Sequence, residues 1–116
     1  ALWRAEKVQK KAKKAGFDWP EVSGALDKLS EELEELRAAI AQGTNVAEEL
    51  GDLLFSAVNV ARFVDADPEG ALHGATDKFI ARFRRVEEQA AQAGRSLEGM
   101  SLEELDRLWE RAKEGT

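Results

Sequence analysis

Residues 22–64 read VSGALDKLSEELEELRAAIAQGTNVAEELGDLLFSAVNVARFV. This stretch predicts two amphipathic helices, one on each side of Gly43, because its apolar residues recur with the period of a helix. At 100° per residue, each helix carries a narrow apolar stripe. The stripes contain Val22, Leu26, Leu29, Leu33, Leu36 and Ile40 on the first helix, and Leu50, Leu53, Leu54, Ala57, Ala61 and Val64 on the second. Continuous stripes of this kind are typical of a helical bundle, and we expect the two helices to pair as an antiparallel hairpin.

The rest of the chain also favours helices, since β-branched residues are few and no two-residue hairpin signal separates alternating segments. We therefore expect an all-α bundle of five helices in a single domain of residues 1–116. The predicted helices span residues 1–15, 20–41, 45–64, 67–94 and 101–113. Their expected start signals are Pro20 as a first helical residue, Asn45 with Glu48 as a variant capping box, Asp67 before Pro68, and Ser101 with Glu104 as a capping box.

Composition excludes several classes of protein. No apolar run approaches the roughly 18 residues that a membrane span needs. Cysteine is absent, which rules out disulfide frameworks, thiolate zinc sites and cysteine nucleophiles, and fits a cytoplasmic protein. The net charge is −6, and residues 17–55 contribute ten anions against two cations. An acidic middle makes the chain a poor nucleic-acid binder and a better candidate for binding cations.

Four acidic residues of the predicted hairpin are expected to converge. Glu32 and Glu35 lie on one flank of the first stripe. Glu49 and Asp52 lie on the flank of the second stripe that is reached by rotating about the helix axis in the same direction. In an antiparallel hairpin these flanks point to the same side, so the four carboxylates meet in one patch. Carboxylate oxygens without histidine or cysteine select a hard ion, Mg²⁺ or alternatively Mn²⁺. Ordinary solvated surface charge is the competing interpretation.

Two further groups of residues indicate an anionic, nucleotide-like ligand. Lys78, Arg82 and Arg85 share one flank of the predicted fourth helix and suit phosphate oxygens, although pairing with Glu87, Glu88 or neighbouring helices is the more common use of such cations. Phe17 and Trp19 flank Asp18 in a loop, where they could stack on a base or cap the bundle. No glycine-rich phosphate loop is present, so metal and side chains would have to hold the phosphates.

These residues resemble a known family, the MazG-like nucleoside triphosphate pyrophosphohydrolases. The segment 31–35 followed by 49–52 matches the family signature E-E-x-x-E…E-x-x-D. The likeness covers essentially the whole chain and is greatest to the C-terminal catalytic domain of MazG. It extends over the segments 16–20, 48–55, 77–79, 82–83, 100–102 and 108–109.

The resemblance implies an all-α fold that works as a homodimer and a Mg²⁺-dependent hydrolysis of nucleoside triphosphate to nucleoside monophosphate and pyrophosphate. It implies that Glu32, Glu35, Glu49 and Asp52 are the catalytic metal ligands. It also implies that the nucleotide is contacted by Lys78, Arg82, Trp109 and Lys113 and, near the base, by Phe17 and Trp19. The role of Asp77, which is often Asn in relatives, stays open.

From these observations we expect an enzyme of broad base specificity that cleans up the nucleotide pool. Two other functions fit the same sequence. One is a non-catalytic helical module that dimerises through its apolar faces. The other is a regulatory domain that binds nucleotides without hydrolysing them. Mg²⁺-dependent turnover separates the enzyme from both.

Overall fold

The computed structural model describes residues 1–115 and confirms the all-α prediction, since this part of the chain contains helices and no β-strand. The order of elements is α1 (Leu2–Lys14), α2 (Val22–Gln42), α3 (Val46–Phe63), α4 (Pro68–Gln92), a short 3₁₀ helix η1 (Leu97–Gly99) and α5 (Leu102–Lys113). Within the described residues, no helix is long and apolar enough to cross a membrane. The chain divides into two compact units, Ala1–Ala71 and a second from Leu72 onward.

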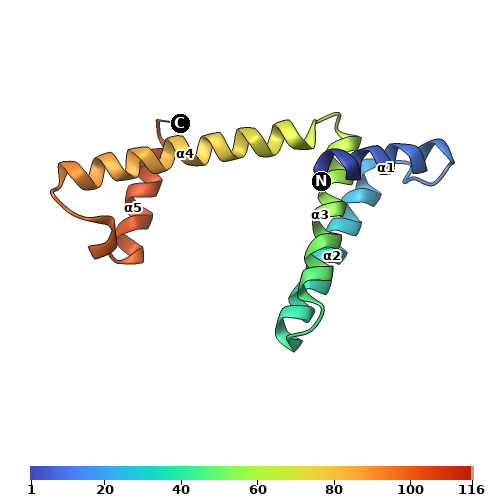
Figure 1. Ribbon diagram of the computed structural model, residues 1–116, viewed down its shortest axis with the longest axis horizontal. Helices are drawn as coiled ribbons and strands as arrows, with labels where there is room; N and C mark the ends of the chain where they lie inside the picture. Colours follow the sequence, from blue (N-terminus) through green and yellow to red (C-terminus); the bar gives the residue numbers. More distant parts are fainter. Residues whose placement is uncertain (116) are drawn as a thin grey trace. The chain divides into compact units, whose positions relative to one another are not determined.

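The first unit is built on the hairpin of α2 and α3, which pack against each other along their length (Figure 1). Gly43 ends α2 in the left-handed conformation, with φ 72°, and its N–H donates to the carbonyl of Ala39. Glycine adopts this conformation without steric cost, which is why the predicted break falls there. The antiparallel hairpin expected from the sequence is therefore present.

α1 completes the first unit. It packs on α3 and lies across the end of the hairpin that is remote from the Gly43 turn (Figure 1). Gln9 is the buried residue of α1, and its side chain reaches the backbone of α3. Phe17, Asp18 and Trp19 follow α1 as the predicted loop and lead the chain back to α2.

One predicted helix start and one predicted capping box are wrong. α2 begins at Val22 with Glu21 as its N-cap, so Pro20 belongs to the preceding loop and is not a first helical residue. Asn45 does cap α3 in position, but it adopts φ 57° and its side chain makes no capping hydrogen bond. In this left-handed conformation the tight turn after Gly43, rather than a capping box with Glu48, sets the start of α3.

The two apolar stripes are only partly covered in the hairpin, because Leu29, Leu36 and Leu53 are half-buried while other members of the stripes stay exposed. On α2 the buried residues are Ala25, Glu32 and Ala39. Leu26, Leu33 and Ile40, each one residue further along, are 46%, 40% and 61% exposed. On α3, Leu50 and Leu54 are likewise about half exposed. Small residues at the seam let the two backbones approach closely, and the leucine face is left uncovered within this unit.

The second unit contains most of α4, together with η1 and α5. α4 begins at the predicted cap, where the carboxylate of Asp67 accepts hydrogen bonds from the N–H groups of Glu69 and Gly70. α5 begins with the predicted capping box, in which Ser101 and Glu104 satisfy each other's backbone N–H. The ring of Trp109 lies 5.3 Å from that of Phe79, so α5 packs on α4.

Candidate metal centre and adjoining pocket

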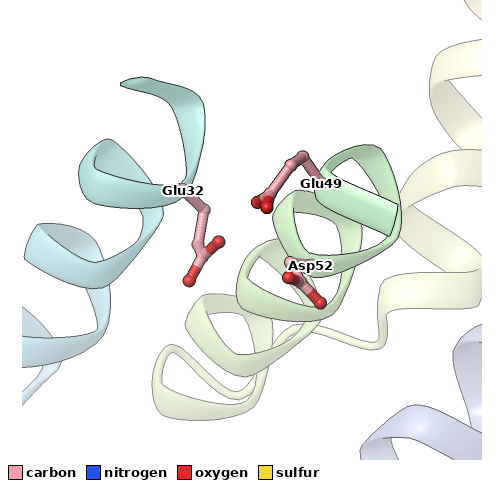
Figure 2. Close-up of side chains that lie close together, drawn as sticks. All are labelled: Glu32, Glu49 and Asp52. Atoms are coloured by element: carbon pink, nitrogen blue, oxygen red, sulfur yellow. The ribbon is translucent and has the colours of Figure 1, made fainter. Parts of the chain in front are cut away.

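Three of the four predicted carboxylates lie together between α2 and α3. Glu32 projects from α2, Glu49 projects from α3 toward it, and Asp52 lies beside Glu49 on α3 (Figure 2). One carboxylate oxygen from each lies within 4.8 Å of the others. Glu32 occupies the seam of the hairpin, where only 6% of its surface is exposed. The pairing of two helices, rather than the spacing within one, brings these side chains together.

Two oxygens of this cluster lack a protein partner. Glu32 Oε2 and Glu49 Oε2 are both buried and accept no hydrogen bond from the described residues. A buried acceptor without a donor costs about 1–3 kcal/mol. Two carboxylate charges at such a distance repel by about 3–4 kcal/mol at an effective dielectric near 20. A divalent cation would remove both costs, so the residues present fit a hard metal ion.

Glu35 lies at the edge of this group. The charge of Glu32 raises the pKa of Glu35, and hydrogen bonding with the same carboxylate and the charge of Glu49 add to the effect. Glu35 is exposed and does not belong to the close three-residue set. The structure thus places it electrostatically next to the cluster, one turn of α2 beyond Glu32.

A cavity of about 540 Å³ adjoins the carboxylates. Glu32 and Asp52 line one part of it, and Phe17 and Trp19 of the aromatic loop line another. This volume falls within the range of pockets that hold small-molecule ligands. Acidic residues of the hairpin and aromatic residues of the loop before it therefore share one pocket of the first unit.

The aromatic loop is held by a partner that sequence reasoning missed. Asp18 accepts two hydrogen bonds from Arg62 of α3, at 2.9 and 2.7 Å. These hydrogen bonds from Arg62 lower the pKa of Asp18. Arg62 is almost entirely buried, with 7% of its side chain exposed. A lone arginine on an otherwise apolar stretch of helix was the available signal, but the residues are 44 positions apart and their pairing depends on how α1 and α3 pack.

Trp19 is fixed by a close approach to α2. A Cβ atom added at Gly24 would lie 3.1 Å from the indole ring, which is tighter than normal contact. Trp19 is 43% exposed, whereas Phe17 is 83% exposed. Trp19 is therefore a packed wall of the pocket, and Phe17 is a largely free aromatic at its mouth.

The other predicted site residues lie in the second unit. Lys78 and Arg82 are on α4, on either side of Phe79, which stacks on Phe83 and contacts Trp109. Lys113 is on α5 and its Nζ lies 3.5 Å from Glu110. Within that unit, Trp109 thus packs against Phe79, the residue that follows Lys78 on α4.

Asp77, whose role the sequence left open, is also on α4. Its carboxylate lies 3.5 Å from the imidazole of His73, one turn earlier, and both side chains are exposed. At this exposure the contact is a local pair on the helix surface.

Residues 20–87 match the family model described as the MazG nucleotide pyrophosphohydrolase domain. The chain is 46% identical over 115 residues to a Thermotoga maritima protein named nucleoside triphosphate pyrophosphohydrolase/pyrophosphatase MazG, covering 99% of this chain and 45% of that protein. It is 40% identical over 117 residues to the nucleoside triphosphate pyrophosphohydrolase of Escherichia coli K12, covering 97% and 44%.

The chain thus spans less than half the length of both relatives. The matched family region includes both helices of the acidic hairpin and most of α4. The chain belongs to the MazG family of nucleotide pyrophosphohydrolase domains.

Proposed function

We propose that this chain hydrolyses nucleoside triphosphates to nucleoside monophosphates and pyrophosphate. The observation that carries the proposal is the pair of unpartnered carboxylate oxygens on Glu32 and Glu49, next to a nucleotide-sized pocket. The names of its relatives support the same reaction. The proposed role is clean-up of the nucleotide pool in the cytoplasm, with broad base specificity.

Mg²⁺ is the proposed cofactor, with Mn²⁺ as a substitute. Glu32, Glu49 and Asp52 would hold the ion through carboxylate oxygens, and Glu35 would join them from the edge of the cluster. When bound, such an ion supplies a Lewis acid that neutralises phosphate charge. All four are oxygen donors, which is the ligand chemistry that Mg²⁺ prefers.

The chain's own residues would then position and activate water. Oε1 of Glu32 is already paired with Lys28, whose Nζ lies 3.1 Å away, so Glu35 is the freer carboxylate to accept the water proton. In the proposed step the water oxygen bonds in line to the α-phosphorus and gives its proton to Glu35. The bond from this phosphorus to the oxygen that bridges to the β-phosphate breaks, and pyrophosphate leaves with the electron pair.

Residues of the second unit are proposed to bind the nucleotide. Lys78 and Arg82 would donate to phosphate oxygens, and Trp109 and Lys113 would add contacts beside them. In this proposal both units act as one functional domain of residues 1–116, and Phe17 and Trp19 lie near the base.

We further propose that the chain works as a homodimer whose interface includes the leucine face of the hairpin. Leu26, Leu33 and Ile40 recur every seven residues and are each at least 40% exposed, and Leu50 and Leu54 extend the face onto α3. Large apolar residues at this spacing are typical of helix–helix interfaces, and contiguous exposed apolar surface favours association. A second copy of the same face would cover it.

The reaction is tested by incubating the protein with a nucleoside triphosphate and Mg²⁺ and identifying the products by chromatography. Nucleoside monophosphate and pyrophosphate are expected, whereas nucleoside diphosphate and orthophosphate would refute the proposed cleavage. Asp52→Ala should lose turnover and retain its helical circular dichroism. Mg²⁺-dependent nucleotide binding without turnover would indicate a regulatory domain, and metal-indifferent dimerisation alone would indicate an interaction module.

A further inference from the structure

The wall of the pocket formed by α1 and α3 contains two side-chain amides, Gln9 and Asn59, that the proposed hydrolysis does not use. Gln9 is buried, with 6% of its surface exposed. Its Nε2 donates to the backbone carbonyl of Phe55 at 2.9 Å. Its Oε1 is buried and accepts no hydrogen bond from the described residues.

Chemistry fixes the orientation of the Gln9 amide. A backbone carbonyl can only accept a hydrogen bond, so the NH₂ group of Gln9 must face Phe55. The oxygen is thereby left as an unsatisfied acceptor in a buried wall of the pocket. Buried polar atoms are nearly always paired, so an unpaired acceptor that lines a cavity is a site for a donor from the cavity, either water or a ligand.

The orientation of the Asn59 amide is fixed in the same way, but by a partner that donates. Its Oδ1 accepts hydrogen bonds from Arg62 Nε at 3.2 Å and from Arg62 Nη2 at 2.5 Å. A guanidinium can only donate, so Oδ1 must face Arg62 and Nδ2 is the free end of the amide. Asp18 holds the other edge of the same guanidinium, which locks Arg62 in place.

The pocket therefore offers one oriented acceptor and one oriented donor. Gln9 is anchored on the backbone carbonyl of Phe55, one turn before Asn59 on α3, and both amides line the same cavity. Trp19 lines the same cavity. A planar ligand with a donor next to an acceptor on its edge suits this arrangement.

We propose that Gln9 and Asn59 read the pairing edge of the nucleobase, with Gln9 Oε1 accepting from a base N–H and Asn59 Nδ2 donating to a base oxygen or ring nitrogen. This assignment rests on the proposed function. Adenine, guanine, cytosine and uracil all carry a neighbouring donor and acceptor on that edge. The two amides would thus favour a nucleotide over a sugar phosphate that lacks a base, and would accept any of the four bases, in agreement with the proposed broad specificity.

The first experiment compares nucleoside triphosphates with ribose 5′-triphosphate, which lacks a base, in a pyrophosphate-release assay. Gln9→Met preserves the shape of the side chain and removes the acceptor. We expect the ratio of kcat/KM for ATP to that for ribose 5′-triphosphate to fall about tenfold, mainly through KM, because binding of the base is what the acceptor supports. The control is Gln42→Met, an exposed glutamine at the end of α2, which should keep the wild-type ratio.

The second experiment replaces the hydrogen-bond donor of Asn59 by an acceptor. Asn59→Asp places an acceptor where Nδ2 stood and still offers an oxygen to Arg62, so the fold is retained and circular dichroism checks it. Two acceptors require two adjacent donors, which only guanine offers, at N1–H and N2–H₂. The ratio of kcat/KM for GTP to that for UTP should rise about tenfold or more.

The outcomes separate this inference from the proposed function. Equal losses for ATP and ribose 5′-triphosphate in Gln9→Met, an unchanged GTP preference in Asn59→Asp, or a wild-type enzyme indifferent to the base would each overturn the base-reading assignment while leaving the hydrolase intact. A wild-type protein that releases no pyrophosphate from any triphosphate would overturn the proposed function itself.

Discussion

Lys28 Nζ lies 3.1 Å from Oε1 of Glu32, one turn later on α2, and so neutralises one side of a carboxylate whose other oxygen faces the cluster. The hydrogen bond from Lys28 to Glu32 raises the pKa of Lys28, so the amine stays charged. The cluster thus has a built-in counter-ion on one side and unsatisfied oxygens on the other.

Removing the counter-ion should strengthen metal binding. In Lys28→Gln the cluster loses a nearby positive charge that repels a divalent cation, and we expect Mn²⁺ to bind about threefold more tightly. Paramagnetic resonance of free Mn²⁺ during titration measures this. Lys14→Gln, which removes an exposed charge from α1, should leave the affinity unchanged. Weaker binding in Lys28→Gln would show that Lys28 organises the ligands instead of opposing the ion.

Removing one carboxylate should stabilise the metal-free protein. Glu49→Gln ends its repulsion with Glu32 and supplies an amide donor, so the free energy of unfolding without divalent ions should rise by about 1–2 kcal/mol. The stabilisation by Mg²⁺, about 2.7 kcal/mol for the wild type at 100 times Kd, should largely disappear. Turnover should fall on the order of 100-fold or more.

Chemical denaturation, measured once with a chelator and once with Mg²⁺, checks the gain in metal-free stability and the loss of stabilisation by Mg²⁺ in Glu49→Gln. Glu48→Gln is the matched control, because Glu48 is the exposed neighbour of Glu49 and lies outside the cluster. A metal-free Glu49→Gln protein less stable than the wild type would contradict the repulsion argument.

The buried ion pair of Asp18 and Arg62 should contribute measurably to stability. Asp18→Asn leaves the guanidinium without its charged partner, and we expect a loss of about 3 kcal/mol at neutral pH. Asp27→Asn, on the exposed side of α2, should change stability little.

The same pair predicts a pH dependence. The pKa of Asp18 is lower in the folded protein than in the unfolded chain, where it is about 3.9. Its contribution is therefore fully present above that value and is lost as pH falls through the folded pKa. The stability difference between wild type and Asp18→Asn should shrink in acid. A difference that stays constant from pH 7 to pH 3 would show that packing of the loop, not charge, carries the effect.

The leucine face gives a prediction about assembly. Leu33→Glu puts a charge in the middle of the proposed dimer interface, and sedimentation velocity should show a monomer in place of a dimer. Leu102→Glu is the control, because Leu102 is 75% exposed on α5 and lies outside this face. A wild-type protein that sediments as a monomer would exclude the homodimer outright.

The sequence by itself predicted the helices and most of their ends. Gly43 and the reciprocal cap of Ser101 and Glu104 act within a few residues, so their signals are local and readable. The acidic motif was also readable, because one hairpin with a defined turn sets the levels of Glu32, Glu49 and Asp52. Asn45 shows the limit, since its residue type predicted the cap position correctly, but with its left-handed backbone the side chain makes no capping hydrogen bond.

Tertiary structure alone decided what each face contacts. A helical period shows that a face is apolar but does not show which partner covers it. Here Ala25, Glu32 and Ala39 are buried, while Leu26, Leu33 and Ile40, each one residue further along, stay exposed. The contacts of Asp18 with Arg62 and of Gln9 with Phe55 join residues 44 and 46 positions apart. Such pairs depend on how α1 packs against α3, and no spacing along the chain contains that information.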